Sequence, residues 1–173
     1  MTVQKRHQFK SNWPIPDMFM LELGRMTTLW GSLESTITLN IGVLAGYEKM
    51  FDSRALILLA HSNFQQRLHM LGSLCEFLLV DYPQLASYES VVKKIEAAQK
   101  ARNKYAHNSV VFNEETGKMN TSSFSSRGKL KLNTEDVELC HIQEASSKIH
   151  EAMCALHALV TTKEMKPLWE RDI

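Results

Sequence analysis

The sequence feature that most restricts the fold is a series of apolar residues spaced three or four positions apart near the N-terminus. The series comprises Phe19, Leu23, Met26, Trp30, Leu33, Ile37, Ile41 and Leu44. This spacing places every member on one face of an α-helix. It predicts a helix that begins near Asp17, a residue type able to cap a helix, and that ends close to Gly46. An amphipathic helix of this kind has to bury its apolar face against further elements.

Two more segments in the first two thirds of the chain show the same periodicity. One starts at Asp52 or Ser53, either of which suits a helix cap, and is stopped by the Asp-Tyr-Pro sequence at residues 81–83. The other starts near residues 84–88 and should end at Asn108, a residue type that often follows a helix. We therefore expect a second and a third long helix.

Residues 109–133 break the helical pattern. They contain a short β-prone run, a Ser-rich turn and an alternating Lys-Leu-Lys-Leu sequence, which together predict an irregular excursion or a small β-hairpin. Thr134, Glu135 and Asp136 then have the residue types of a helix N-terminus. They predict a fourth long helix, which Pro167 ends.

Four long amphipathic helices with short connections predict an all-α fold. We expect a four-to-five-helix up-and-down bundle with a short irregular or β-hairpin excursion between the third and fourth helices. The expected parts are an N-terminal arm (1–16), a helical bundle (17–161, with the excursion at 109–133) and a C-terminal tail (162–173). A chain of 173 residues fits one hydrophobic core.

The composition narrows the class of protein. A net charge of +1 gives the whole chain no strong basic field, so nucleic acid would have to bind to a local patch. Three cysteines are too few for a disulfide framework, and no apolar run is long enough to cross a bilayer. No secretory signal is visible at the N-terminus. We therefore expect a cytoplasmic protein that has no membrane partner.

The residues most indicative of function lie at positions 100–108, near the end of the third predicted helix. Arg102 is followed directly by Asn103, and four residues separate Arg102 from His107. Five basic residues and one acidic residue between positions 91 and 108 give a local net charge of +4. This segment resembles the HEPN family, whose mark is an Arg followed at a short spacing by His, often with Asn directly after the Arg. The order of the predicted helices over residues 17–161 is also similar to that family.

The resemblance implies an activity and an assembly. Active members of the family cut RNA without a metal, leave cyclic phosphate ends and usually pair their motifs in a dimer. His107 would then be the general base or acid, Arg102 the phosphate anchor and Asn103 the positioning group. The family also suggests a toxin or antiviral defence effector with a cognate protein partner. The expected site residues are catalytic His107, Arg102 and Asn103, substrate-binding Lys100 and Lys104, and supporting Glu34 and Tyr105.

The motif residues Arg102 and His107 do not lie on the same face of an ideal helix. Arg102 and His107 are five positions apart, which corresponds to about 140° around an ideal helix. Either the last turn is distorted, or a second copy of the motif completes the site across a two-fold axis. The resemblance favours the second alternative and implies a homodimer built partly on the first and third helices.

Other candidate residues leave questions open. Glu34 borders the apolar face of the first helix and should need a cationic partner, for which Arg102 and Arg67 are both candidates. We expect neither a metal nor a cofactor. His150, Cys154 and His157 have helical spacing, but the apolar residues around them favour packing over metal binding.

Two other interpretations compete with the ribonuclease. One is a catalytically inactive HEPN-like module that binds RNA, a nucleotide or a partner protein. The other is a structural dimerisation module without a ligand, in which Arg102 pairs with an acid and His107 binds a carbonyl group. Because the motif alone does not separate these classes, whether the chain is an enzyme stays open at this point.

Overall fold

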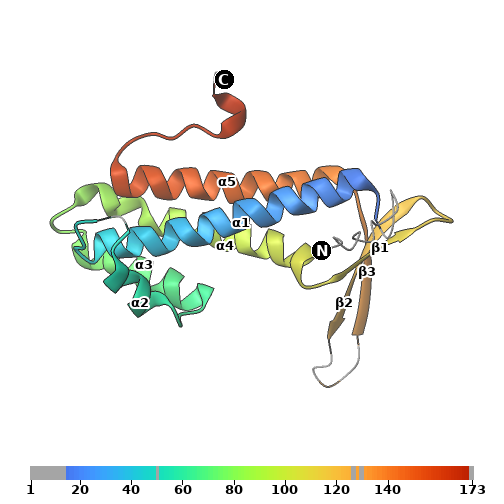
Figure 1. The fold of residues 1–173 in the computed structure, drawn as a ribbon, viewed down its shortest axis with the longest axis horizontal. Coiled ribbons are helices and arrows are strands. Elements are labelled where there is room, and N and C mark those ends of the chain that lie inside the picture. Colours follow the sequence, from blue (N-terminus) through green and yellow to red (C-terminus); the bar gives the residue numbers. More distant parts are fainter. Residues whose placement is uncertain (1–14, 50, 126–127, 129–130, 172–173) are drawn as a thin grey trace, which may run out of the picture.

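Three long helices lie side by side in the computed structural model, which describes residues 15–49, 51–125, 128 and 131–171. They are α1 (Asp17–Leu44), α4 (Tyr88–Ala106) and α5 (Leu139–Thr161). Helices α1 and α5 run in the same direction, and α4 runs in the opposite direction (Figure 1). The shorter helices α2 (Ser53–Leu59) and α3 (Phe64–Leu78) pack against α1. Short 3-10 helices, η1 (Pro83–Ser87) and η2 (Leu168–Glu170), precede α4 and follow α5.

The apolar series near the N-terminus does form one long helix, as predicted. The cap prediction is wrong, however, because Asp17 is the first helical residue and Pro16 occupies the capping position. The fixed φ of proline suits the start of a helix, and the backbone oxygen of Pro16 accepts from the N–H groups of Phe19 and Met20.

The second predicted helix is two helices. Asp52 caps α2 as expected, since its side chain accepts a hydrogen bond from the backbone N–H of Arg54. A second start signal follows at Asn63, whose side chain accepts from the backbone N–H of Gln66. The Gln66 side chain accepts in return from the backbone N–H of Asn63, which completes a capping box. This box ends one helix and begins the next where the apolar spacing alone indicated continuity.

The prediction of an all-α fold is wrong. Three strands form an antiparallel sheet in the order β1 (Ser109–Asn113), β2 (Lys118–Ser125), β3 (Lys131–Val137). The turn between β1 and β2 is set by Asn113, whose side chain accepts hydrogen bonds from two backbone N–H groups, and by Gly117 at φ 67°. The predicted excursion therefore contains a small β-sheet, which lies at one end of the long helices (Figure 1).

The predicted start of the fourth helix is also wrong. Thr134, Glu135 and Asp136 belong to β3 and lie opposite residues 120–122 of β2. Strand pairing gives their backbone groups partners, and it places Val137 opposite Met119, with both side chains buried. Burial of these two side chains outweighs the helix-start character of the residues that precede them. Helix α5 begins after Glu138 instead.

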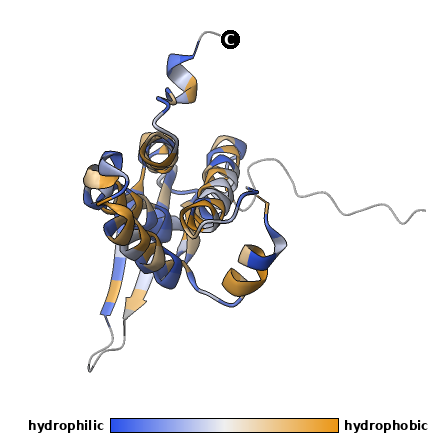
Figure 2. Ribbon diagram, turned by 90° about the vertical axis from the view of Figure 1, so that its left-hand side faces the viewer, coloured by the Kyte–Doolittle hydropathy of each residue, from blue (hydrophilic) through white to orange (hydrophobic). Residues whose placement is uncertain are grey.

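The hydrophobic core lies between α1, α4 and α5. It includes five apolar side chains that are fully shielded from solvent: Leu33, Ile37, Ile95, Ile149 and Leu156. Seen along the long axis, the helices turn apolar residues toward one another (Figure 2). The sheet joins this core through Met119 and Val137. Among the described residues, none of the helices combines the length and apolar character needed to span a bilayer.

Truncation of a core residue should test this arrangement. Leu33 is 0% exposed at the centre of α1, so Leu33→Ala should lower the free energy of unfolding by about 2–5 kcal/mol. Leu58 on α2 is 71% exposed, and Leu58→Ala should change the free energy of unfolding by about 0.5 kcal/mol at most. Urea denaturation followed by circular dichroism measures both variants. Equal losses of stability would contradict the packing described here.

Candidate functional site

The end of α4 brings Arg102 and His107 together within one chain. The helix stops at Ala106, and His107 follows at φ −117° and ψ −3°. Its ring nitrogen Nε2 lies 2.9 Å from Nη1 of Arg102. Of the two arrangements open at the level of the sequence, the structure has the first, because the chain leaves regular helix geometry at the histidine. A second copy of the motif is not needed for this contact.

The guanidinium of Arg102 is held against a buried aromatic ring. Its central carbon lies 5.3 Å from the centre of the Trp30 ring on α1. Trp30 is 5% exposed, and its ring in turn packs 4.7 Å from that of Phe64, the first residue of α3. A planar cation over an indole face is attracted to the ring and loses part of its conformational freedom. Three helices therefore contribute to the placement of Arg102.

Asn103 contacts the arginine. Its side-chain oxygen accepts a hydrogen bond from Nη1 of Arg102 at 3.2 Å. The same nitrogen thus serves both Asn103 and His107. Among the described residues, Nε and Nη2 of Arg102 have no hydrogen-bond partner. These two donors remain available for the oxygen atoms of an anion, which a guanidinium binds in a bidentate manner.

His107 is exposed to solvent, and its contact with Arg102 fixes its chemical form. A guanidinium can only donate hydrogen bonds, so Nε2 of His107 has to accept. An accepting Nε2 requires the neutral imidazole with its proton on Nδ1. In this form Nε2 carries the lone pair of the ring.

Glu34 has neither of the partners considered for it. It lies one helical turn after Trp30 and is half-buried, but among the described residues no ion pair joins it to Arg102 or Arg67. Arg67 instead donates to the backbone oxygen of Ser62 and to the hydroxyl of Thr38. The guanidinium of Arg102 packs against the Trp30 ring, and this contact does not involve a carboxylate. Neither proposed ion pair forms among the described residues, and the supporting role of Glu34 stays a prediction.

Lys104 connects the motif helix to the sheet. Its Nζ lies 2.6 Å from Oε2 of Glu135 on β3. This hydrogen bond raises the pKa of Lys104 and lowers the pKa of Glu135, so both stay charged at neutral pH. The hydroxyl of Thr121 on β2 also reaches the backbone oxygen of Lys104, at 3.4 Å. The expected substrate-binding lysine is thus largely neutralised and has a structural partner.

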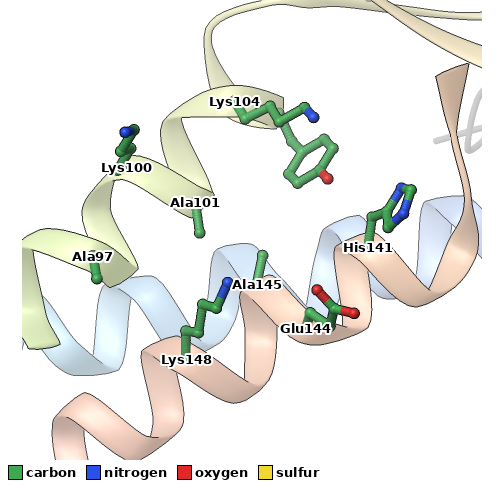
Figure 3. A pocket seen from close by; sticks show the side chains of 9 residues that line it. Ala97, Lys100, Ala101, Lys104, His141, Glu144, Ala145 and Lys148 are labelled. Carbon is green, nitrogen blue, oxygen red and sulfur yellow. The ribbon is translucent and has the colours of Figure 1, made fainter. Parts of the chain in front are cut away.

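Lys100 belongs to a groove on another side of α4. The groove lies between α4 and α5 and has a volume of about 590 Å³. Small side chains lie between the two helices, and lysines from both helices surround them (Figure 3). Tyr105 also lines it, and burial raises the pKa of its hydroxyl. The labelled residues of the groove are Ala97, Lys100, Ala101, Lys104, His141, Glu144, Ala145 and Lys148.

The predicted site residues therefore divide into two groups. Arg102, Asn103 and His107 form one cluster, whereas Lys100, Lys104 and Tyr105 line the groove, which neither Arg102 nor His107 does. Trp30 was not predicted as part of the site, because its position on the apolar stripe explained it as a core residue. Glu135 was not predicted because the residues around it resembled a helix start.

The possible metal ligands of the described residues lie apart from this cluster. Within the described part of the chain, the group of side chains whose ligand atoms lie close enough to hold an ion is Glu138, Cys140 and His141, all exposed at the start of α5. His141 accepts there from the backbone N–H of Glu138, and the Cys140 thiol donates to the Glu138 carboxylate at 3.6 Å. These contacts belong to the cap of α5.

The tautomer of His107 can be measured directly. At a pH where the ring is neutral, ¹⁵N NMR of the imidazole should show the proton on Nδ1, because Arg102 occupies Nε2. Arg102→Met should redistribute the proton between the two nitrogens. His61, an exposed histidine, is the internal control and should not respond to this substitution. A proton on Nε2 of His107 in the unsubstituted protein would contradict the contact.

Comparison of the chain with protein-family models, with curated proteins and with solved structures gave no match. The resemblance to the HEPN family therefore rests on the motif residues and on the order of the helices around them.

Proposed function

We propose that the chain cleaves RNA without a metal, at the cluster formed by Arg102, Asn103 and His107. The observation that carries the proposal is the 2.9 Å contact between Arg102 Nη1 and His107 Nε2 at an exposed helix end. It puts a base and a phosphate-binding cation side by side where an RNA strand can reach them. Nε and Nη2 of Arg102, which have no partner among the described residues, add the capacity to hold two phosphate oxygens.

The chemistry follows from these groups. Nη1 of Arg102 turns from the imidazole toward the bound phosphate, which frees Nε2 of His107 to accept the proton of a ribose 2′-hydroxyl. The 2′-oxygen then attacks the phosphorus, and the bond to the 5′-oxygen breaks. The imidazolium returns its proton to that leaving oxygen, so the products are a cyclic phosphate and a 5′-hydroxyl. Arg102 stabilises the negative charge that develops on the phosphate.

The charge around the cluster favours a short contact with the RNA backbone. Lys100 is exposed but lines the groove between α4 and α5, which neither Arg102 nor His107 lines. Lys104 contributes little charge because of Glu135. With a net charge of +1, binding should involve few phosphates and depend only moderately on salt.

A second candidate function is a binding module without catalysis. The observation that favours it is that Arg102 occupies Nε2 of His107, the nitrogen needed as the base. If the guanidinium stays there when RNA binds, the cluster is an anion-binding site and no proton is transferred. The cleavage experiment described below separates these two functions.

Assembly into a homodimer, action as a toxin or antiviral effector, and a cognate protein partner are proposals that rest on the family resemblance. One feature supports a dimer in which α1 takes part: the first turns of α1 expose Met18, Met20 and Leu21 by half or more. We expect light scattering after size-exclusion chromatography to give twice the mass of the chain, and Leu21→Glu to halve it. A monomer at high micromolar concentration would contradict the dimer but not the cleavage.

Cleavage is tested with purified protein, a mixed RNA pool and EDTA. His107→Ala and Arg102→Ala should each lower the rate by about a hundredfold or more, which is the usual contribution of a general base. The products should carry cyclic phosphates. Arg102→Ala should also weaken RNA binding, because the phosphate contact is lost. His61→Ala and Arg54→Ala remove the same residue types at exposed positions away from the cluster and should keep the rate.

Two results would decide against the enzyme. Cleavage that EDTA abolishes would contradict a metal-independent reaction. Salt-sensitive RNA binding without cleavage, reduced by Arg102→Ala, would support the binding module instead. Circular dichroism spectra of all four variants control for loss of folding.

A further inference from the structure

Two cavities lie beside α5, and they differ in whether an unpartnered polar atom meets solvent. Next to the cavity between α1 and α5, of about 480 Å³, the unpartnered atoms of Glu22, Ser146 and His150 are shielded from solvent. Shielded atoms cannot receive a ligand unless the side chains rearrange. The groove between α4 and α5 has a volume of about 590 Å³, which is within the range of small-molecule sites. It is therefore the better candidate for a binding site.

Tyr105 gives the groove an unpartnered hydroxyl group. The residue is 7% exposed and lines the groove. Within the described part of the chain its hydroxyl makes no hydrogen bond, and it is not one of the unpartnered atoms that are shielded from solvent. The hydroxyl therefore keeps a surface that a ligand can reach. Burial raises the pKa of Tyr105, so the group stays protonated at neutral pH and can donate to a ligand oxygen.

Two exposed side chains of α5 lie at the same end of the groove, His141 and Glu144 (Figure 3). Nδ1 of His141 accepts from the backbone N–H of Glu138, so the neutral ring carries its proton on Nε2 and offers a donor. Glu144 has no ion pair among the described residues and offers an acceptor. Because this end contains donors and an acceptor that do not bond to one another, it suits a ligand hydroxyl, which both accepts and donates.

The other end of the groove is cationic. It contains Lys100 of α4 and Lys148 of α5, neither of which forms an ion pair within the described residues. The Lys148 side chain extends from α5 toward α4 (Figure 3). Lys104 is neutralised by its ion pair with a residue of β3. Two unpaired lysines against the one carboxylate of the lining leave a single positive charge, which a ligand with one negative charge would balance.

Small side chains separate the two ends. Ala101 of α4 and Ala145 of α5 lie in the middle of the groove, and Ala97 lies beyond them (Figure 3). Methyl groups leave room for a flat ring and give it an apolar surface to contact. The five positions from Lys100 to Tyr105 correspond to a rise of about 7.5 Å along α4, comparable with the length of a para-substituted benzene ring.

We propose that the groove between α4 and α5 binds a small monocarboxylate that has a flat apolar body and a hydroxyl group at its opposite end. The ligand's carboxylate would lie between Lys100 and Lys148, and its ring would lie over the alanines. Its hydroxyl would accept from Tyr105 and donate to Glu144. The proposal is independent of RNA cleavage, since no residue of the cluster proposed for cleavage lines the groove.

The compound 4-hydroxyphenylacetate is a simple probe for this chemistry. Calorimetric titration of the full chain should show saturable binding, with a dissociation constant of about a millimolar or tighter, as expected for so small a ligand. Phenylacetate lacks the hydroxyl and should bind about fivefold more weakly. The neutral 4-hydroxyphenylacetamide should also bind about fivefold more weakly, because it lacks the charge. Added salt should weaken binding of the two carboxylates and not of the amide.

Replacement of one tyrosine tests the hydroxyl contact. Tyr105→Phe should weaken binding of 4-hydroxyphenylacetate by about three- to tenfold and leave the affinity for phenylacetate within about twofold. The unfolding temperature should not fall, because the hydroxyl has no partner among the described residues. Tyr82→Phe is the matched control, since Tyr82 is 50% exposed and does not line the groove. It should leave both affinities within about twofold.

Replacement of one lysine tests the charge contact. Lys148→Gln should weaken binding of 4-hydroxyphenylacetate by about fivefold and leave the affinity for the neutral amide within about twofold. Lys94→Gln removes an exposed lysine of α4 that does not line the groove, and it should change neither affinity by more than about twofold. Because Lys148 is exposed, this variant also tests the proposal if Tyr105→Phe fails to fold.

Three results would overturn the proposal. They are the absence of saturable binding of 4-hydroxyphenylacetate, equal affinity for this compound and phenylacetate, and unchanged affinity in both Tyr105→Phe and Lys148→Gln. A lower unfolding temperature in Tyr105→Phe with no change in affinity would assign the hydroxyl a structural role instead. RNA cleavage by the same protein preparation is measured separately, so failure of one proposal does not decide the other.

Discussion

The candidate site depends on the packing of one guanidinium against one buried indole. Trp30 belongs to the core through α1 and through its contact with Phe64, and its face is the surface on which Arg102 rests. Because the stacked guanidinium is fixed, its Nη1 can meet His107 as the chain leaves α4. The sheet stabilises the same helix end from the other side, through the ion pair between Lys104 and Glu135. The hydrophobic core and the sheet therefore both contact the helix end that carries the motif.

The sequence predicted the helices where periodicity was the only strong signal and failed where two signals competed. The stripe from Phe19 to Leu44 became α1 because nothing within it favours a turn. The capping box at Asn63 and the strand pairing of residues 134–136 were both overlooked, since apolar spacing does not report local caps or long-range pairing. The same limit applies to the site. Arg102 and His107 were found from their spacing, but Trp30 was not, because a partner from another helix becomes visible only after packing.

The two cavities show different physical designs. The groove between α4 and α5 surrounds small side chains with lysines. The cavity between α1 and α5 is lined by polar residues of both helices and by Leu168 and Trp169 of η2.

The central claim is that Arg102 and His107 of the same chain act together on RNA. Mixing the Arg102→Ala and His107→Ala proteins tests this claim most directly, because a site shared between two chains would be rebuilt in the mixed dimers. The account predicts that the unsubstituted protein cleaves RNA in EDTA and that the mixture, after exchange of subunits, stays inactive. Restored cleavage in the mixture, or no cleavage by the unsubstituted protein, would contradict it.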